Sequence, residues 1–352
     1  MNTDVQPVRS GEELDTANLL GFLTESLGID SSEISILQFP AGSSNLTYCV
    51  GIGGGEYVLR RPPFGNQVKS AHDMSREFKV LSKLSDVYAP APKPLLYCDD
   101  ESVIGSEFFL MERRRGLVIR GNSPDFLEQS VDLQFAVCES FVKNLADLHA
   151  LDYKSAGLAD LGKPEGYAER QVEGWTKRYL DVKTHAHHEL ETAIAWLGEN
   201  IPESAGASLV HNDYKFDNVM LRQENLTEIS AVLDWEMATI GEPLMDLGTT
   251  LGYWMSREAG KEMMSMPFNP RALMESISRR EIVGMYARFS GRDVSDILFY
   301  YVFGTVKIAV IAQQIFARYS KGLTKDVRFA NFDLFVKALG QIAMHSIGRG
   351  SI

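Results

Sequence analysis

The sequence predicts an α+β protein of two lobes: a small N-terminal lobe built on a five-stranded antiparallel sheet with one helix, and a larger, mainly helical C-terminal lobe. Three observations carry this prediction. Short apolar runs separated by glycine, proline and asparagine turns fill the first third of the chain. From Ser123 onward, apolar residues recur mostly at helical spacing. With 352 residues, the chain is also long enough to bury more than one core.

The N-terminal lobe is predicted to begin with a helix that ends near Leu27. Ser10 and Glu13 have the spacing of a capping box, so Ser10 is the expected N-cap. Strands are expected at residues 34–39, 46–52 and 57–60, with a glycine turn at 53–55 between the last two. A helix over 70–84 and two further strands, at 95–98 and 108–111, complete the lobe.

The C-terminal lobe is predicted from apolar stripes at helical spacing. Helices are expected between residues 123 and 148, over 165–182 and 188–197, and again after residue 244, with short strands and loops in the centre. The boundary is expected within 111–116, which gives lobes of residues 1–112 and 113–352. The arginines at 113–115 are interpreted as a solvated surface loop rather than a direct phosphate contact.

Composition narrows the class of protein. A formal net charge of −12 and a pI of about 5.1 argue against a general nucleic-acid binder and are ordinary for an acidic cytoplasmic protein. The polar, acidic N-terminus does not resemble a signal peptide. The longest apolar run, 297–316, contains glycine, lysine and glutamines, which favours a buried helix over a membrane span. Cys49, Cys98 and Cys138 lie far apart and are expected to be reduced core residues.

Chemically useful side chains are densest between residues 209 and 220. His211, Asp213, Lys215 and Asn218 follow an apolar run, and a second apolar run, 229–233, ends in Asp234. This is the H-x-D-x-K-x-x-N spacing of a kinase catalytic loop followed by an aspartate at the end of a strand. Each residue alone would be an ordinary loop residue, so the prediction depends on their joint spacing.

Phosphoryl transfer assigns a role to each of these residues. The Asp213 carboxylate would orient and deprotonate a hydroxyl, and the Lys215 amine would balance the charge of a γ-phosphate. Asn218 and Asp234 offer oxygen ligands of the kind that Mg²⁺ prefers. His211 is interpreted as a structural residue that hydrogen-bonds the loop backbone.

The chain resembles the aminoglycoside phosphotransferase and choline kinase family, which has the bilobal protein-kinase-like fold. Within that family it is most similar to the phosphotransferase-like domain fused to certain acyl-CoA dehydrogenases. The segments that carry this similarity are 57–63, 157–166, 171–175 and 211–220. Because no dehydrogenase domain follows Ile352, the stand-alone form is expected.

The resemblance implies a nucleotide site in the N-terminal lobe. Arg60 takes the position of the basic residue that grips the α- and β-phosphates, and Glu77 that of its helix partner. Most of the family has lysine there, and the alternative is a weak surface ion pair between strand and helix. Ser43, Ser44 and Asn45 would cover the phosphates, although a plain hairpin turn would look similar. The backbone of Met111, Glu112 and Arg113 would meet adenine.

Further features are interpreted by the same comparison. Trp235 and Glu236 replace the Phe-Gly of protein kinases, which favours a small-molecule kinase, and Asp246 would anchor the catalytic loop. Gln171, Trp175 and Arg178 share one helical face that either lines an acceptor pocket or packs inward. The histidines 185, 187 and 188 are interpreted as surface helix because no partner carboxylate is evident at ligand spacing. The methionine-rich segment 255–266 is expected to be core filler or a mobile loop.

These observations predict an ATP- and Mg²⁺-dependent phosphotransferase that acts on a hydroxyl of a small molecule. For the acceptor, the name of the family suggests an aminoglycoside, whereas the most similar subfamily points to a metabolic hydroxyl compound such as a hydroxyacyl-CoA. The alternative is a nucleotide-binding regulatory pseudokinase without catalysis. The protein is expected to be a cytoplasmic monomer or homodimer that binds neither nucleic acid nor membrane.

Overall fold

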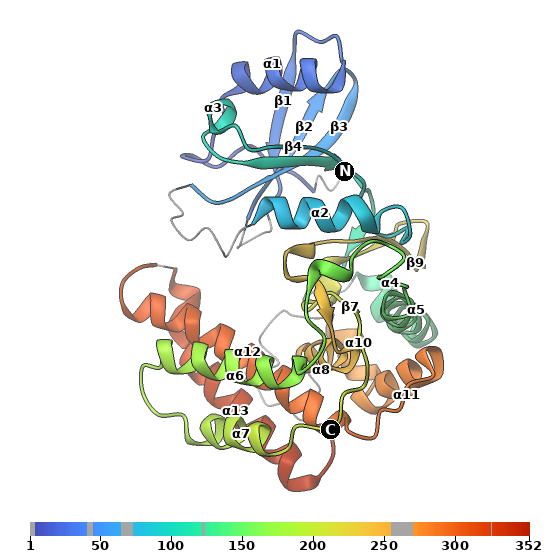
Figure 1. The fold of residues 1–352 in the computed structure, drawn as a ribbon, viewed down its shortest axis with the longest axis vertical. Helices are drawn as coiled ribbons and strands as arrows, with labels where there is room; N and C mark the ends of the chain where they lie inside the picture. The colour runs from blue at the N-terminus through green and yellow to red at the C-terminus, as the bar shows by residue number, and fades with distance from the viewer. Residues whose placement is uncertain (1–3, 41–44, 65–72, 122–123, 255–269, 325) are drawn as a thin grey trace. The chain divides into compact units, whose positions relative to one another are not determined.

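The structure, a computed structural model, describes residues 4–40, 45–64, 73–121, 124–254, 270–324 and 326–352 (Figure 1). The chain forms two compact units. Unit 1 comprises Met1–Arg115 and Ala231–Glu236, and unit 2 comprises Gly116–Ser230 and Met237–Ile352. The first crossing lies inside the window expected for the boundary, slightly after residue 112. The return of Ala231–Glu236 to unit 1 was not predicted.

Unit 1 is built on an antiparallel sheet of five strands in the order β1-β2-β3-β5-β4. The predicted five-stranded sheet is therefore confirmed, with the helix inserted after the third strand. The strands are β1 (Ile34–Gln38), β2 (Leu46–Ile52), β3 (Gly55–Arg61), β4 (Pro94–Cys98) and β5 (Phe108–Glu112). The inserted helix is α2 (Met74–Leu84), with Asp73 as its N-cap; residues 70–72 of the predicted helix lie outside the described residues.

Helix α1 (Thr16–Leu27) ends where it was predicted to end but begins later. Its N-cap is Asp15, whose carboxylate accepts from the backbone N–H groups of Ala17 and Asn18. The prediction of Ser10 as N-cap is wrong. Leu14 is 8% exposed and packs into the core of unit 1, so the chain before Asp15 is used for packing rather than for a helical turn.

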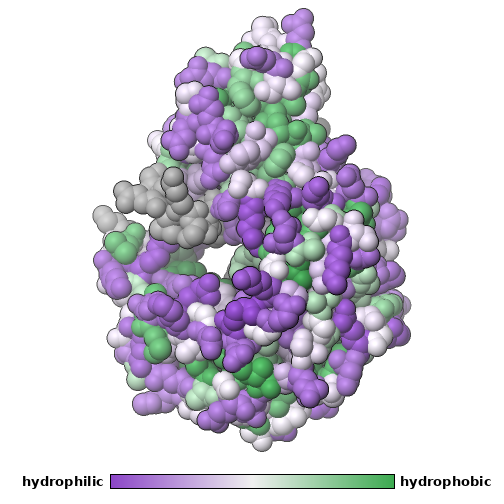
Figure 2. Space-filling view, in the orientation of Figure 1, coloured by the Kyte–Doolittle hydropathy of each residue, from purple (hydrophilic) through white to green (hydrophobic). Residues whose placement is uncertain are grey.

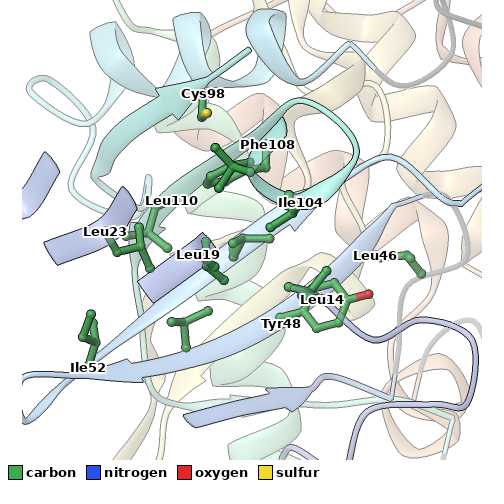
Figure 3. Packing of buried hydrophobic residues seen from close by; sticks show 13 residues of the cluster. Leu14, Leu19, Leu23, Leu46, Tyr48, Ile52, Cys98, Ile104, Phe108 and Leu110 are labelled. Carbon is green, nitrogen blue, oxygen red and sulfur yellow. The ribbon is translucent and has the colours of Figure 1, made fainter. Parts of the chain in front are cut away.

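The sheet of unit 1 has two differently occupied faces. Alternate residues of β2 and β3, such as Tyr48, Val50 and Leu59, pack with Leu19 and Leu23 of α1 in one apolar cluster (Figure 3). Helix α2 packs against β4 and β5, where Phe78 contacts Phe109. Because side chains alternate along a strand, the neighbour of Leu59, Arg60, is directed away from the α1 cluster and toward α2. A short helix that was not predicted, α3 (Glu101–Ile104), lies between β4 and β5.

Unit 2 is mainly helical, as predicted. Its helices are α4 (Asp125–Glu128), α5 (Val131–His149), α6 (Tyr167–Val182), α7 (His188–Glu199), α8 (Pro243–Tyr253), α10 (Arg271–Ser276), α11 (Arg279–Ser290), α12 (Ile297–Ser320) and α13 (Phe332–Arg349). Short 3₁₀ segments lie at η1 (Ala159–Leu161), η2 (Phe216–Asn218), η3 (Trp235–Met237) and η5 (Val327–Asn331). Residues 255–269, which include the methionine-rich segment, lie outside the described residues.

Helix α12 is the centre of unit 2 and packs against α8 and α13. It is long and apolar enough to cross a membrane, but 78% of its most apolar window is buried, so it is a core helix of this unit. Glycines allow the close approach of α12 to α8: a Cβ atom at Gly304 would overlap the carbonyl oxygen of Gly248. Figure 2 shows the resulting exterior, on which hydrophilic residues cover most of the face drawn.

Two small antiparallel pairings frame the chemically dense loop of unit 2. Strand β7 (Ser208–Val210) pairs with β10 (Thr239–Gly241), and β6 (Leu117–Val118) pairs with β8 (Val219–Arg222). Strand β9 (Asn225–Val232) lies beside β8 and carries the chain back to unit 1. The loop 211–218 therefore leaves one strand, β7, and enters another, β8, so both of its ends are fixed.

Candidate active site

Asp213, Lys215 and Asn218 come together in unit 2. The Lys215 ammonium donates to Oδ2 of Asp213 at 2.8 Å. The Asn218 amide nitrogen donates to the same oxygen and to the backbone carbonyl of Asp213, both at 2.9 Å. These contacts fix the Asp213 carboxylate, and the carbonyl oxygen of the Asn218 side chain, which a cation would bind, takes no part in them.

The residue before the proposed base, Asn212, has a left-handed backbone with a φ of 67°. This conformation is uncommon for a residue other than glycine and persists where the surroundings over-determine it. The surroundings do so here: the Asn212 N–H donates to Asp246, its carbonyl accepts from Lys307 at 2.6 Å, and its side-chain oxygen accepts from Tyr167. The strained turn thereby presents Asp213 in one defined place.

Asp246, fully buried on α8, anchors this loop as the sequence predicted. Its two carboxylate oxygens accept from the N–H groups of His211, at 2.7 Å, and Asn212, at 2.8 Å. Burial works to raise the pKa of Asp246, but hydrogen bonds from His149 and the loop backbone outweigh it and hold that pKa below its ordinary value. His211 has the structural role expected, because its Nδ1 accepts from the N–H of Asp213.

His149 and Tyr286 continue the support beneath Asp246. The His149 ring lies between the Asp246 carboxylate, at 3.2 Å, and the Tyr286 hydroxyl, at 2.8 Å. Burial lowers the pKa of His149 despite the neighbouring carboxylate, which favours the neutral ring. The sequence analysis did not select either residue. The only feature of the sequence that could have marked these two residues is that each is polar within an otherwise apolar helical stripe.

Lys307 is the most informative residue that the sequence analysis missed. It lies in the middle of α12, is 2% exposed, and donates to the carbonyl oxygen of Asn212. Burial lowers its pKa from 10.5 to about 8, although the carboxylates of Asp213 and Asp246 oppose this. A lysine inside a long apolar run was its signal, and buried lysines with lowered pKa values gather at functional sites.

Lys215 is also partly enclosed. Its ammonium lies 4.8 Å from the centre of the Tyr253 ring, a cation–π contact from the last turn of α8. Burial opposes the charged form, but Tyr253 and the Asp213 carboxylate outweigh burial and raise the pKa of Lys215. Lys215 is therefore a permanent cation beside Asp213.

Unit 1 contains a second cluster, formed by Arg60, Glu77 and Asp234. The Arg60 guanidinium donates to Oε1 of Glu77 and to Oδ1 of Asp234, both at 2.8 Å. The side chains of Arg60 and Glu77 are 9% and 1% exposed, so the alternative of a weak surface pair is wrong. Asp234 is 30% exposed and is the part of this cluster nearest to solvent.

Burial dominates the electrostatics of this cluster. It raises the pKa of Glu77 to about 7, even though Arg60 lowers it and the Trp235 N–H donates to Oε1. Glu77 Oε2 and Arg60 Nε are buried without a hydrogen-bond partner. Asp234, like Asn212, has a left-handed backbone, with a φ of 69°. A buried arginine with unmet hydrogen-bonding capacity beside a strained aspartate is an arrangement suited to an anionic ligand and its cation.

The remaining nucleotide-site predictions have mixed outcomes. Ser43 and Ser44 lie outside the described residues. Asn45 is buried and donates to Glu236 at 2.7 Å, which ties the start of β2 to the segment after Asp234. The Glu112 N–H donates to the carbonyl of Lys93, which leaves its own carbonyl to face a base, and the adenine contact of Met111, Glu112 and Arg113 stays a prediction.

The basic run 113–115 is ion-paired rather than freely solvated. The Arg113 side chain is 5% exposed and contacts Asp4 at 2.6 Å and Glu56 at 2.8 Å, so the interpretation as a solvated loop is wrong for this residue. Arg115 also pairs with Glu56, and Arg114 pairs with Glu112. Arg113 is therefore enclosed in unit 1, whereas the Arg114 and Arg115 side chains are 34% and 68% exposed, so the interpretation as solvated surface holds for Arg115.

The structure shows how the face of α6 that carries Trp175 is packed. Trp175 is 6% exposed and packs inward from α6, and two cations contact its ring: Arg178 at 4.7 Å and Lys307 at 5.6 Å from the ring centre. Because Lys307 also binds the carbonyl of Asn212, this aromatic face and the Asp213 loop are linked through one side chain. Inward packing is therefore confirmed for Trp175, and the acceptor pocket stays a prediction.

Comparison with known proteins settles the family. The sequence profile of the Phosphotransferase enzyme family matches residues 35–265, which include both clusters. The chain belongs to this family. Acyl-CoA dehydrogenase family member 11 from Rattus norvegicus is 35% identical over 332 residues, covering 91% of this chain and 41% of that protein. The Homo sapiens protein of the same name is 34% identical with the same coverage. The chain thus spans less than half the length of these relatives, and the predicted resemblance is confirmed.

Solved structures confirm the phosphotransferase fold. A proposed aminoglycoside phosphotransferase from Ralstonia eutropha superposes with a TM-score of 0.81 at 28% identity, covering 96% of this chain and 99% of that chain. Choline kinase from Cryptosporidium parvum superposes with a TM-score of 0.63 at 14% identity, covering 96% of this chain and 97% of that chain, which shows a shared fold. A mutant of aminoglycoside phosphotransferase APH(4)-Ia, solved with ADP and hygromycin B, has a TM-score of 0.60 at 15% identity, covering 93% and 97%.

Proposed function

We propose that this family member transfers the γ-phosphate of ATP, with Mg²⁺, to a hydroxyl group of a small molecule. One observation carries the proposal: Asp213 sits on a strained, fully anchored loop with Lys215 and Asn218 hydrogen-bonded to its carboxylate. A carboxylate fixed in this way is prepared to receive a proton, and its neighbours supply a permanent positive charge and an oxygen ligand for a cation.

In the proposed reaction, the acceptor hydroxyl gives its proton to Asp213 as its oxygen forms a bond to the γ-phosphorus. The bond from that phosphorus to the bridging oxygen breaks, and ADP leaves with the electron pair. Lys215 and Arg60 balance the phosphate charge. The oxygens of Asn218 and Asp234 are hard ligands that fit Mg²⁺, which would neutralise the phosphates when bound.

Arg60 and Asp234 currently neutralise each other, at 2.8 Å. The proposal assigns a new partner to each when nucleotide is present: Arg60 would bind phosphate oxygens, and Asp234 would bind the cation. Because one opposite-charge pair is exchanged for two others, neither Arg60 nor Asp234 is left without a counter-charge beside the buried Glu77. Arginine suits this exchange since its planar fork can hold Glu77 and a phosphate at the same time.

The charges around Trp175 support an anionic acceptor. Lys307 and the exposed Arg178 both lie over its ring, and Lys307 binds the residue next to Asp213. These cations would repel a polycationic aminoglycoside and attract the phosphates or carboxylates of a metabolite. Together with relatives that are acyl-CoA dehydrogenases, this favours a hydroxyacyl-CoA.

The test uses the full chain with Mg²⁺ and ATP labelled at the γ-phosphate. The acceptor panel contains hydroxyacyl-CoA thioesters of several chain lengths, kanamycin and choline. We expect label on a hydroxyacyl-CoA, no transfer by Asp213→Ala, and a raised KM for the acceptor alone in Arg178→Ala. Transfer to kanamycin would overturn the acceptor assignment. Nucleotide binding without transfer to any acceptor would favour the regulatory pseudokinase instead.

A further inference from the structure

Three metal-ligating side chains converge in unit 2 outside the residues used above. His185 and His187 lie in the loop between α6 and α7, and Asp333 lies in the first turn of α13. Nε2 of His185 is 3.1 Å from Oδ1 of Asp333, and Nε2 of His187 is 3.4 Å from the same oxygen. We call these three residues the His–Asp cluster. The sequence interpretation that no carboxylate partners these histidines is wrong.

The spacing of the His–Asp cluster fits one small metal ion. All three ligand atoms lie within 4.8 Å of one another. Ligands bound tetrahedrally to zinc at about 2.1 Å are about 3.4 Å apart. Both nitrogen–oxygen separations are close to that value, so a zinc ion could bind all three side chains with small ring movements.

Burial shows that this contact is incomplete as it stands. His187 is 5% exposed, and its Nε2 has no hydrogen-bond partner. Oδ1 of Asp333 is likewise buried without one. A proton on Nε2 or a cation between the two atoms would supply the partner that both lack and offset the cost of their burial.

The surrounding contacts hold the ligands in place. The Thr184 hydroxyl lies 3.1 Å from Nδ1 of His185, the nitrogen that faces away from Asp333. Gln313 of α12 donates to that hydroxyl and to the carbonyl of Val182, both at 3.1 Å. Metal-bound histidines commonly use their second nitrogen in this way, and such contacts fix the orientation of the ring.

We propose that the His–Asp cluster binds one zinc ion, which fastens the α6–α7 loop to the start of α13. Figure 1 shows α7 and α13 side by side, and they pack against each other. Two imidazoles and one carboxylate favour zinc or cobalt over Mg²⁺, which prefers oxygen ligands. His185 is 50% exposed, so water can complete a fourth position. The site is independent of phosphoryl transfer.

The test is metal binding by untagged full-length protein after dialysis against a chelator. Titration with cobalt is expected to give the intense visible bands of tetrahedral Co²⁺ at one ion per chain, and calorimetry with zinc the same stoichiometry. His187→Gln and Asp333→Asn are each expected to weaken zinc binding at least tenfold. His188→Gln changes an exposed neighbour outside the cluster, and its affinity should stay within twofold of wild type.

Unfolding temperature provides a second readout, because zinc that binds the folded chain raises the midpoint in wild type and His188→Gln but not in Asp333→Asn. If His187→Gln fails to fold by circular dichroism, the half-exposed His185→Gln replaces it. The proposal is overturned by the absence of stoichiometric binding at about 100 μM zinc, or by equal binding in wild type and cluster variants.

Discussion

The two charged clusters of this phosphotransferase are built in opposite ways. Asp213, Lys215 and Asn218 of unit 2 lie within one short loop and contact each other directly. Arg60, Glu77 and Asp234 of unit 1 come from a strand, a helix and a distant segment that returns to the unit. The first cluster is fixed by local geometry and the second by long-range charge pairing.

This difference suggests that the two clusters must rearrange to different extents when a ligand binds. The Asp213 loop is held from below by Asp246 and Lys307, so its carboxylate is in place before any ligand arrives. In the Arg60 cluster, the guanidinium is already ion-paired with both Glu77 and Asp234. In the proposed mechanism, unit 2 is preorganised for the acceptor, whereas unit 1 must exchange partners when nucleotide binds.

The largest expected effect comes from the local cluster. Asp213→Ala removes the proposed base and should lower phosphoryl transfer about 10³-fold or more, while nucleotide binding changes little. Labelled-phosphate transfer and calorimetry with ATP measure the two quantities. Asp132→Ala, at an exposed position in α5, serves as the control. Full activity in Asp213→Ala would sink the assignment.

The long-range cluster should respond through stability. Arg60→Met leaves the Glu77 carboxylate, 1% exposed, without its counter-ion, and should cost about 3 kcal/mol of the free energy of unfolding or more. Urea denaturation measures this loss. Adding Glu77→Gln removes the unpaired charge and should restore part of the stability. If Arg60→Met lowers the free energy of unfolding by less than about 0.5 kcal/mol, Arg60 and Glu77 behave as an exposed ion pair and the prediction is wrong.

The lowered pKa of Lys307 predicts that the free energy of unfolding depends on pH. Its pKa is lowered to about 8 in the folded chain from 10.5, so between these values the unfolded chain binds more protons. The contribution of Lys307 to stability therefore rises as pH increases from about 8 to 10.5 and is lost as pH falls through 8, by about 3 kcal/mol at most. Urea denaturation at pH 7.5 and 9.5 should show this rise in wild type and not in Lys307→Met. An equal change in the free energy of unfolding between the two pH values in both proteins would contradict this prediction.

The smallest effect concerns helix packing beneath the loop. Gly304→Ala would place a Cβ atom against the Gly248 carbonyl and should cost about 1 to 3 kcal/mol, because α12 must move away from α8. Gly284→Ala, in α11, meets no atom within 4 Å and should stabilise by about 0.5 to 1 kcal/mol. Thermal unfolding compares the two variants. A harmless Gly304→Ala would show that this close approach does not hold Lys307 in place.

The sequence predicted what depends on local pattern. Short apolar runs between turns located all five strands of unit 1, and the spacing from His211 to Asn218 predicted residues that do contact one another. Asp246 was predicted as the anchor of the loop, and the structure shows its two hydrogen bonds. Such features can be predicted because the spacing of residues within one strand or loop determines which side chains lie close together.

The misses share a physical cause, which is proximity created by tertiary packing. Lys307 reaches Asn212 only because paired glycines bring α12 close to α8. Asp333 meets His185 and His187 only because α13 packs on α7. Ser10 had the spacing of a cap, but the burial of Leu14 decided where the first helix could begin. No periodicity within one segment reports such contacts.

The return of residues 231–236 to unit 1 has a consequence for how this gene can be divided. A fragment of residues 1–115 would keep Arg60 and Glu77 but lose Asp234, the hydrogen bond from the Val232 N–H to the Pro90 carbonyl, and the ring of Trp235 against Tyr88. The complementary fragment would expose those same apolar residues. Neither unit is one continuous segment of the chain. Recombination in this family should therefore transfer the whole chain as one piece, and its long matches within larger relatives are examples of this.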